Sequence, residues 1–194
     1  SSTTTSANRA STSARDGWAE VPPPAVVDSD PASTAVFFTT HSVPISMSQT
    51  SGPVEARGEG EESLGIYAQQ HELAIEQVIA AVHARRGGAV PEWALVYQSR
   101  SGPPTMPWLE PDINDAIRGA AATGITAVIV VPIGFASDHV EVIWDLDHEA
   151  LETATDLGLA FERVSTPGID PRFVSALVDR VEEALRGRRY RARL

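Results

Sequence analysis

Residues 132–147 combine the end of an apolar stretch with a high density of groups that bind protons or cations. Asp138, His139, Glu141 and Asp145 follow one another closely in this segment. Carboxylates beside an imidazole are costly at the mouth of a buried strand unless they handle protons or a metal ion. Oxygen and imidazole ligands suit ferrous iron and release it more readily than thiolates do. The segment therefore predicts a site for cation delivery or proton removal.

The same acidic residues also have a structural interpretation. On an ideal helix at about 100° per residue, the following carboxylates share one face: Asp138, Glu141, Asp145, Glu149 and Glu152. A solvated acidic face is the ordinary interpretation, above all for Glu149 and Glu152, and Asp138 could cap the helix. However, like charges at this spacing repel, and no Lys or Arg lies between Asp138 and Glu162.

The elements that would position this segment alternate between strand and helix. Runs of β-branched and aromatic residues predict strands at 35–40, 93–97, 125–131 and 159–164. Apolar residues at helical spacing, with Gly or Pro near the ends, predict helices at 64–86, 111–124, 137–157 and 171–185. This order predicts an α/β fold, in which a parallel four-stranded sheet carries helices on both faces.

Polar groups follow three of the predicted strands. His41 ends the first strand, Gln98 and Ser99 follow the second, and residues 132–139 follow the third. In open parallel sheets, ligands bind beyond the carboxyl ends of the strands. A lone histidine after a strand is commonly a hydrogen-bonded spacer, but a position opposite His139 favours a functional role for His41. We therefore expect the three polar groups to meet at one sheet edge.

Composition excludes several classes of protein. With 15 basic and 26 acidic residues the net charge is −11, which argues against nucleic-acid binding. The absence of cysteine excludes disulfides, thiolate nucleophiles, cysteine-ligated zinc and iron–sulfur clusters, and it suits the cytoplasm. No apolar stretch approaches the roughly 20 residues of a membrane span, so peripheral membrane contact is the most that we expect.

The chain of 194 residues suits one folded domain with atypical ends. Residues 1–33 are rich in Ser, Thr, Ala and Pro, and we expect a flexible segment there. That segment superficially resembles an organellar transit peptide, but it has no clear amphipathic helix. We expect residues 34–186 to form the α/β lobe and residues 187–194 to form a solvated basic tail.

Three motifs resemble the ferrochelatase family. Residues 38–44, FTTHSVP, resemble the strand-end histidine motif of that family, and residues 131–141, VPIGFASDHVE, resemble its second signature. Residues 97–103, YQSRSGP, and 107–109, PWL, match the segment that links the two. The order and spacing make this resemblance specific. The sequence is similar to actinobacterial members, which implies coproporphyrin III rather than protoporphyrin IX as the porphyrin.

The resemblance implies roles for individual residues. His41 would face the porphyrin centre, where it would accept a pyrrole proton or ligate the incoming metal. Glu141 would be its carboxylate partner across the macrocycle. Asp138, His139 and Asp145 would continue a polar path for metal and protons toward solvent. The family's acidic helix carries a widened turn, which would shift the ideal-helix angles used above.

On the porphyrin side, the resemblance implies that Gln98 and Ser99 bind the substrate and that Trp108 flanks the macrocycle. The implied activity is insertion of ferrous iron into the porphyrin in haem biosynthesis. Iron and porphyrin are both substrates, so we expect no permanently bound cofactor. Two alternatives remain open: a chelatase for another metal or tetrapyrrole, and a non-catalytic metal- or haem-binding module.

The resemblance covers only residues 34–185, which correspond to the second half of a ferrochelatase. The first half is a similar α/β lobe that lines the other wall of the porphyrin cleft. We therefore expect a fragment, a processed piece or one partner of a split enzyme, and we expect no activity from the chain alone. An exposed cleft wall would favour association.

Overall fold

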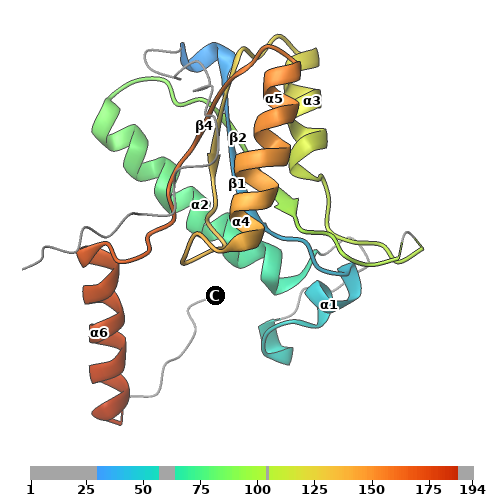
Figure 1. Ribbon diagram of the computed structural model, residues 1–194. Coiled ribbons are helices and arrows are strands. Elements are labelled where there is room, and N and C mark those ends of the chain that lie inside the picture. The colour runs from blue at the N-terminus through green and yellow to red at the C-terminus, as the bar shows by residue number, and fades with distance from the viewer. Residues whose placement is uncertain (1–29, 57–63, 104, 188–194) are drawn as a thin grey trace, which may run out of the picture.

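Parallel strands form the centre of the fold (Figure 1). The computed structural model describes residues 30–56, 64–103 and 105–187, and within these ranges one sheet has the strand order β2-β1-β3-β4. Its strands are β1 (Thr34–His41), β2 (Glu92–Gln98), β3 (Ala127–Val131) and β4 (Ala160–Arg163). All neighbouring pairs are parallel, which confirms the predicted sheet.

Strand β1 lies between β2 and β3, and every residue before His41 is buried. Its alternating side chains reach both faces of the sheet. Pairing with β2 runs from Ala35 as far as His41, which lies opposite Gln98. Pairing with β3 ends earlier, at Phe38 opposite Val131. Strand β1 therefore extends three residues beyond its last partner in β3.

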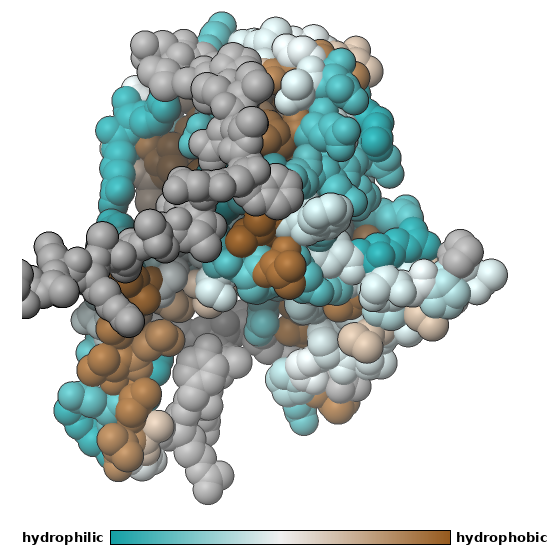
Figure 2. Space-filling model, in the orientation of Figure 1, coloured by the Kyte–Doolittle hydropathy of each residue, from teal (hydrophilic) through white to brown (hydrophobic). Residues whose placement is uncertain are grey.

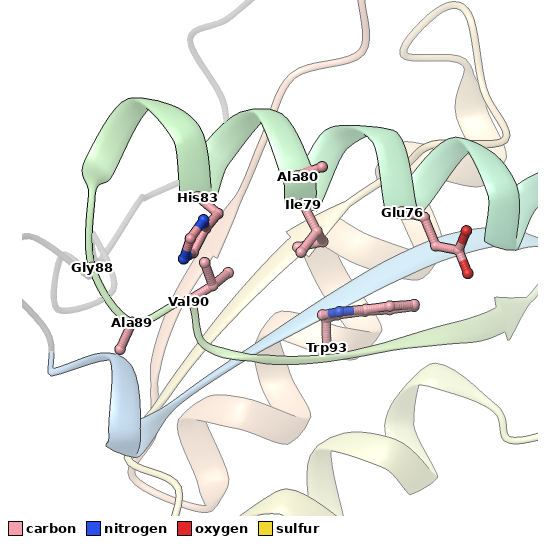
Figure 3. A pocket seen from close by; sticks show the side chains of 8 residues that line it. All are labelled: Glu76, Ile79, Ala80, His83, Gly88, Ala89, Val90 and Trp93. Carbon is pink, nitrogen blue, oxygen red and sulfur yellow. The ribbon is translucent and has the colours of Figure 1, made fainter.

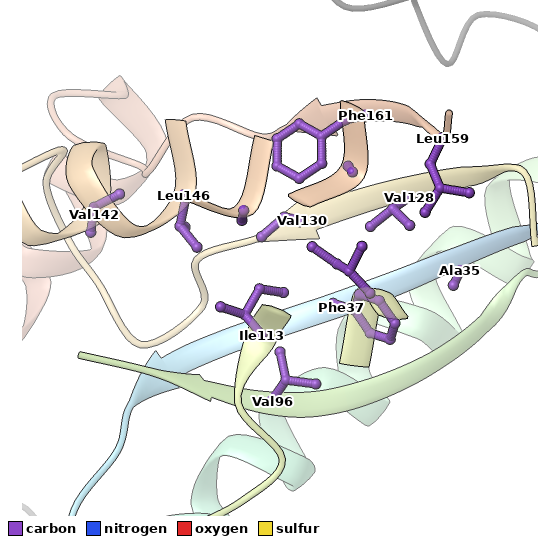
Figure 4. Packing of buried hydrophobic residues seen from close by; sticks show 13 residues of the cluster. Ala35, Phe37, Val96, Ile113, Val128, Val130, Val142, Leu146, Leu159 and Phe161 are labelled. Carbon is purple, nitrogen blue, oxygen red and sulfur yellow. The ribbon is translucent and has the colours of Figure 1, made fainter. Parts of the chain in front are cut away.

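Helices cover both faces of the sheet, as predicted. Helices α3 (Ile113–Ala122) and α5 (Leu151–Asp156) lie on one face, and α2 (Gly65–Arg86) lies on the other (Figure 1). The larger core fills the α3/α5 side, where Phe37 packs with Ile113, Val130, Leu146 and Phe161 (Figure 4). A smaller cluster of Val36, Phe38 and Ile75 lies under α2.

The acidic segment is not the single helix predicted over residues 137–157. It consists of α4 (Val140–Trp144), a π-helical segment η3 (Asp145–Ala150) and α5. Each π turn takes more residues than an α turn, so the ideal-helix face drawn through five carboxylates is wrong. The widened turn implied by the family resemblance is confirmed. Residue His139 occupies the N-cap without a side-chain cap bond, so Asp138 does not cap this helix.

Helix α6 (Pro171–Leu185) has the predicted bounds, and Asp170 caps it by accepting a hydrogen bond from Arg172 N at 2.8 Å. The Arg172 side chain also lowers the pKa of Asp170 to about 2. The helix has no buried residue, and it stands away from the sheet (Figure 1). Its exposed apolar stripe is visible in Figure 2 and includes Val174, Leu177, Val178, Val181 and Leu185.

Short elements flank the sheet where the sequence pattern predicts none. Helix α1 (Ile45–Thr50) follows His41, and the helical turns η1 (Pro31–Ser33) and η2 (Val54–Ala56) lie on either side. The turn η1 leads directly into β1, and the domain boundary after residue 33 stays a prediction. The remaining predictions for residues 1–29 and 188–194 lie outside the described residues. Within the described ranges, no helix combines the length and apolarity that a bilayer span requires.

A core substitution tests the packing of the π-helical segment. Leu146 is fully buried in the larger core, so Leu146→Ala should lower the free energy of unfolding by about 2–5 kcal/mol. Urea unfolding followed by circular dichroism measures this change. The control is Ile169→Ala, which truncates a 91% exposed side chain and should change stability by less than about 0.5 kcal/mol. Equal effects of the two substitutions would contradict the packing described.

Candidate active site

His41 ends β1 at the carboxyl edge of the sheet, and its side chain is half-buried. Its Nδ1 atom lies 2.5 Å from the carbonyl oxygen of Ser42. A carbonyl oxygen only accepts, so Nδ1 carries the hydrogen of this bond. In the neutral ring, Nε2 then keeps its lone pair. His41 can therefore act through Nε2 as a base or as a cation ligand.

The peptide that follows His41 is tied to two neighbouring segments. Ser42 N donates to the carbonyl oxygen of Gln98 at 2.7 Å, and Ser42 Oγ donates to that of Leu109 at 2.9 Å. Leu109 N in turn donates to the carbonyl oxygen of Val43 at 3.0 Å. These hydrogen bonds fix the backbone next to His41 and so restrict the position of its imidazole.

Gln98, Ser99 and Asp145 form a hydrogen-bonded cluster at the same edge. Gln98 Nε2 donates to Asp145 Oδ2 at 3.2 Å, and Ser99 Oγ donates to the same oxygen. Ser99 has a φ of 61°, a left-handed conformation that is uncommon outside glycine. Gln98 is 1% exposed, and its Oε1 has no hydrogen-bond partner among the described residues. The cluster therefore offers a buried acceptor to a proton donor or a cation.

Arg163 of β4 neutralises part of the acidic segment. Its Nε and one terminal nitrogen donate to the two carboxylate oxygens of Asp147, both at 2.7 Å. The other terminal nitrogen donates to Asp138 at 2.7 Å. Hydrogen bonding to Asp147 is the main cause that raises the pKa of Arg163 above its ordinary value. The repulsion expected within the helix is thus relieved by a cation just outside the predicted helix.

His139 and Glu141 lie at the start of α4. The half-buried His139 ring packs against Phe135, with the ring centroids 5.3 Å apart. Glu141 is exposed, and its carboxylate makes no hydrogen bond or ion pair with another described residue, although its carbonyl oxygen accepts from Asp145 N. Among the described residues, no three Asp, Glu or His side chains form a group that could hold a metal ion. The assignment of His41, Glu141, Asp138, His139 and Asp145 to the metal therefore stays a prediction.

Trp108 lies beside the segment that follows His41, because it forms an antiparallel bridge with Pro44. Its indole covers Gly102, where a Cβ atom would collide with Cζ2, Cε2 and Nε1 of the indole. The indole Nε1 is buried without a hydrogen-bond partner among the described residues. The structure therefore brings Trp108 to the predicted edge.

A cavity of about 350 Å³ lies at this edge, and its lining includes Ser42, Tyr97, Arg100, Leu109 and Asp112. A larger hollow of about 670 Å³ lies elsewhere, between α2 and the segment leading into β2 (Figure 3). Its lining includes Ile79, His83 and Trp93. Trp93 lies near the amino end of β2, whereas Gln98 ends that strand, so the larger hollow is not part of the candidate site.

Comparison with known proteins supplies independent findings. A family model described as ferrochelatase matches residues 7–185. The coproporphyrin III ferrochelatase of Leifsonia xyli is 49% identical over 154 residues, covering 76% of this chain and 38% of the relative. That of Streptomyces griseus is 48% identical over 161 residues, covering 83% of this chain and 42% of the relative. The chain thus spans about two-fifths of the length of these curated relatives.

One solved structure that the chain matches is described as a putative cobalamin (vitamin B12) biosynthesis CbiX protein from Marinobacter aquaeolei. It matches with a TM-score of 0.48 and 16% sequence identity, covering 79% of this chain and 98% of that chain.

A glycine substitution tests the packing of the Trp108 indole against Gly102. Gly102→Ala should displace the indole, lower the free energy of unfolding by about 1–3 kcal/mol and change the tryptophan fluorescence. The matched control is Gly119→Ala in α3, where an added Cβ meets no atom within 4 Å. The control should leave the fluorescence unchanged and should not destabilise the protein. Identical emission spectra for both variants would contradict the contact between Gly102 and Trp108.

Proposed function

The chain belongs to the ferrochelatase family, and we propose that it forms one wall of an enzyme that inserts ferrous iron into coproporphyrin III in haem biosynthesis. The names of the two relatives support the choice of porphyrin and metal. The observation that carries the proposal is the Nδ1 hydrogen bond of His41, which leaves Nε2 available at the sheet edge. Because the chain spans about two-fifths of these relatives, the activity belongs to a larger assembly.

His41 is the proposed base. Iron insertion requires two pyrrole protons to leave the porphyrin and a hydrated cation to lose water. Nε2 of His41 can accept a pyrrole proton or coordinate the incoming iron. When Nε2 takes a proton, the bond from Nδ1–H to the Ser42 carbonyl stabilises the resulting imidazolium. Glu141 is the proposed carboxylate across the macrocycle, and its exposure at the start of α4 leaves it open to a ligand.

Asp145 is the residue that we propose binds protons or cations next along the polar path. It accepts hydrogen bonds from Gln98 and Ser99, so both donors hold its Oδ2 atom in one position. Gln98 Oε1, which has no hydrogen-bond partner in the described part of the chain, adds a second acceptor beside it. Asp138 and His139 extend this path in the proposal, with Asp138 shared with Arg163.

Porphyrin binding is the proposed role of Trp108, Gln98 and Ser99. The indole of Trp108 is fixed by Gly102 and by the bridge to Pro44, which suits contact with a flat macrocycle. Contacts at the porphyrin rim can supply the energy that distorts the ring and exposes its nitrogen lone pairs.

A second lobe is the proposed partner that closes the cleft. The length of the relatives leaves about three-fifths of each unmatched by this chain. The apolar stripe of α6 contains no buried residue, so it could pack against such a lobe. We propose the cytoplasm as the place of assembly, since the composition lacks cysteine.

Substitution of the two central residues tests the function. In the complete enzyme, His41→Ala and Glu141→Gln should each abolish iron insertion into coproporphyrin III while leaving the circular dichroism spectrum unchanged. The measurement is the appearance of the iron porphyrin spectrum under anaerobic conditions. Normal turnover by either purified variant would contradict the assigned roles. Parallel assays with cobalt and with protoporphyrin IX separate this function from that of another chelatase.

The polar cluster gives a second test. Asp145→Ala should raise the ferrous iron concentration needed for half-maximal insertion, because it removes the acceptor that Gln98 and Ser99 hold. Saturating iron should restore most of the rate. The control is Glu152→Ala on the exposed surface of α5, which should leave the iron dependence unchanged. An unchanged iron dependence for Asp145→Ala would favour a solvated acidic face instead.

A further inference from the structure

Tyr67, which lies outside the sequence motifs described above, contacts the backbone of His41. Tyr67 extends from α2 to the end of β1, and its hydroxyl lies 2.8 Å from the carbonyl oxygen of His41. The same hydroxyl lies 2.8 Å from Thr40 Oγ1. Because the carbonyl can only accept, the Tyr67 hydroxyl donates to His41.

The His41 carbonyl needs this donor because the sheet no longer supplies one. Carbonyl groups alternate in direction along a strand, and those of Thr39 and His41 point to the same side. Gly134 N donates to the Thr39 carbonyl at 3.0 Å, although β3 has already ended. The next carbonyl on that side is the one that Tyr67 satisfies. Tyr67 thus takes the place of a strand partner at the residue that bears the proposed base.

Tyr67 is itself held in position by His71, one turn further along α2. Nδ1 of His71 lies 2.7 Å from the Tyr67 carbonyl, and Nε2 lies 3.0 Å from Thr40 Oγ1. The two rings are in contact, with centroids 4.7 Å apart. Burial raises the pKa of Tyr67, so the phenol keeps the hydrogen that it donates. The arrangement leaves the hydroxyl few alternative positions.

We propose that Tyr67 is a positioning residue for the reaction, which orients the His41 imidazole by fixing the carbonyl of the same residue. This inference rests on the proposed role of His41 as base or metal ligand. Four groups then fix the backbone around His41: the Tyr67 hydroxyl, Gln98 O, Leu109 O and the β2 ladder. Only the Tyr67 contact comes from outside the sheet and the segments that follow its strands.

The expected effect is on the rate and not on substrate binding. Tyr67 meets His41 through the main chain, so its loss should let the imidazole move relative to the porphyrin centre. A displacement of about 1 Å can cost on the order of 100-fold in rate. Tyr67→Phe should therefore lower kcat about 10- to 100-fold in the complete enzyme, with KM for porphyrin changed less than about twofold.

Nuclear magnetic resonance of the histidine rings in the 194-residue chain supplies a readout that is independent of turnover. In the unaltered protein, His41 should show one neutral tautomer with the hydrogen on Nδ1. Tyr67→Phe should broaden or shift the His41 ring signals. The matched control is Thr153→Val, which removes a half-buried hydroxyl that joins α5 to Asn114 on the opposite face. It should alter stability similarly without changing the His41 signals.

A second variant identifies the contact responsible. Thr40→Val removes the other hydroxyl partner of Tyr67 but leaves the bond to the His41 carbonyl possible, so the His41 signals should change less than in Tyr67→Phe. Unchanged His41 signals and unchanged kcat in Tyr67→Phe would overturn the proposal. If His41→Ala retained turnover while Tyr67→Phe still shifted the His41 signals, the proposed function would fail and the positioning contact would stand.

Discussion

The unequal pairing of β1 with its two neighbours is the constraint on which the candidate site depends. Hydrogen bonds to β2 continue to His41, whereas those to β3 stop at Phe38. Thr39 and Thr40 are buried and His41 is half-buried, but these last residues of β1 lack a strand on one side, so their backbone polar groups need other partners. A loop amide at Gly134 and a side-chain hydroxyl at Tyr67 provide them. At the candidate site, these two donors thus replace the hydrogen bonds that a longer β3 would supply.

Electrostatics at the edge follow from the same arrangement. Strand β4 contributes Arg163, which pairs with both Asp138 and Asp147. Asp145 accepts its hydrogen bonds from the end of β2 instead. Glu141 is left exposed and without an ion pair among the described residues. The acidic segment is therefore divided between a neutralised part and a part that is open to a ligand.

Much of the fold follows from the sequence, because continuous apolar strands and Gly- or Pro-bounded helices have few other arrangements. The bounds of α6 and the convergence of His41 with the end of β2 were predictable on this basis. The roles of Arg163 and Tyr67 were not. Each acts on a residue far away in the sequence, and Tyr67 sits within a helix whose pattern gives it no distinguishing signal. The position of α6 apart from the sheet was not predictable either, because its amphipathic pattern is that of a helix that packs against a core.

The π-helical segment η3 connects α4, at the candidate site, to α5, which packs in the core. The direction of α4 relative to α5 depends on the number of residues in this segment. Across it, Trp144 Nε1 donates to Glu149, five positions later, where an ordinary helix would align residues four positions apart. Removing one residue between Asp145 and Ala150 would rotate α4 by about 100° relative to α5. The buried Ala150 and Ala154 would stay in the core, while Glu141 would turn away from its present direction. A deletion of one residue in this segment is therefore sufficient to separate Glu141 from the candidate site without a change in any residue of the site.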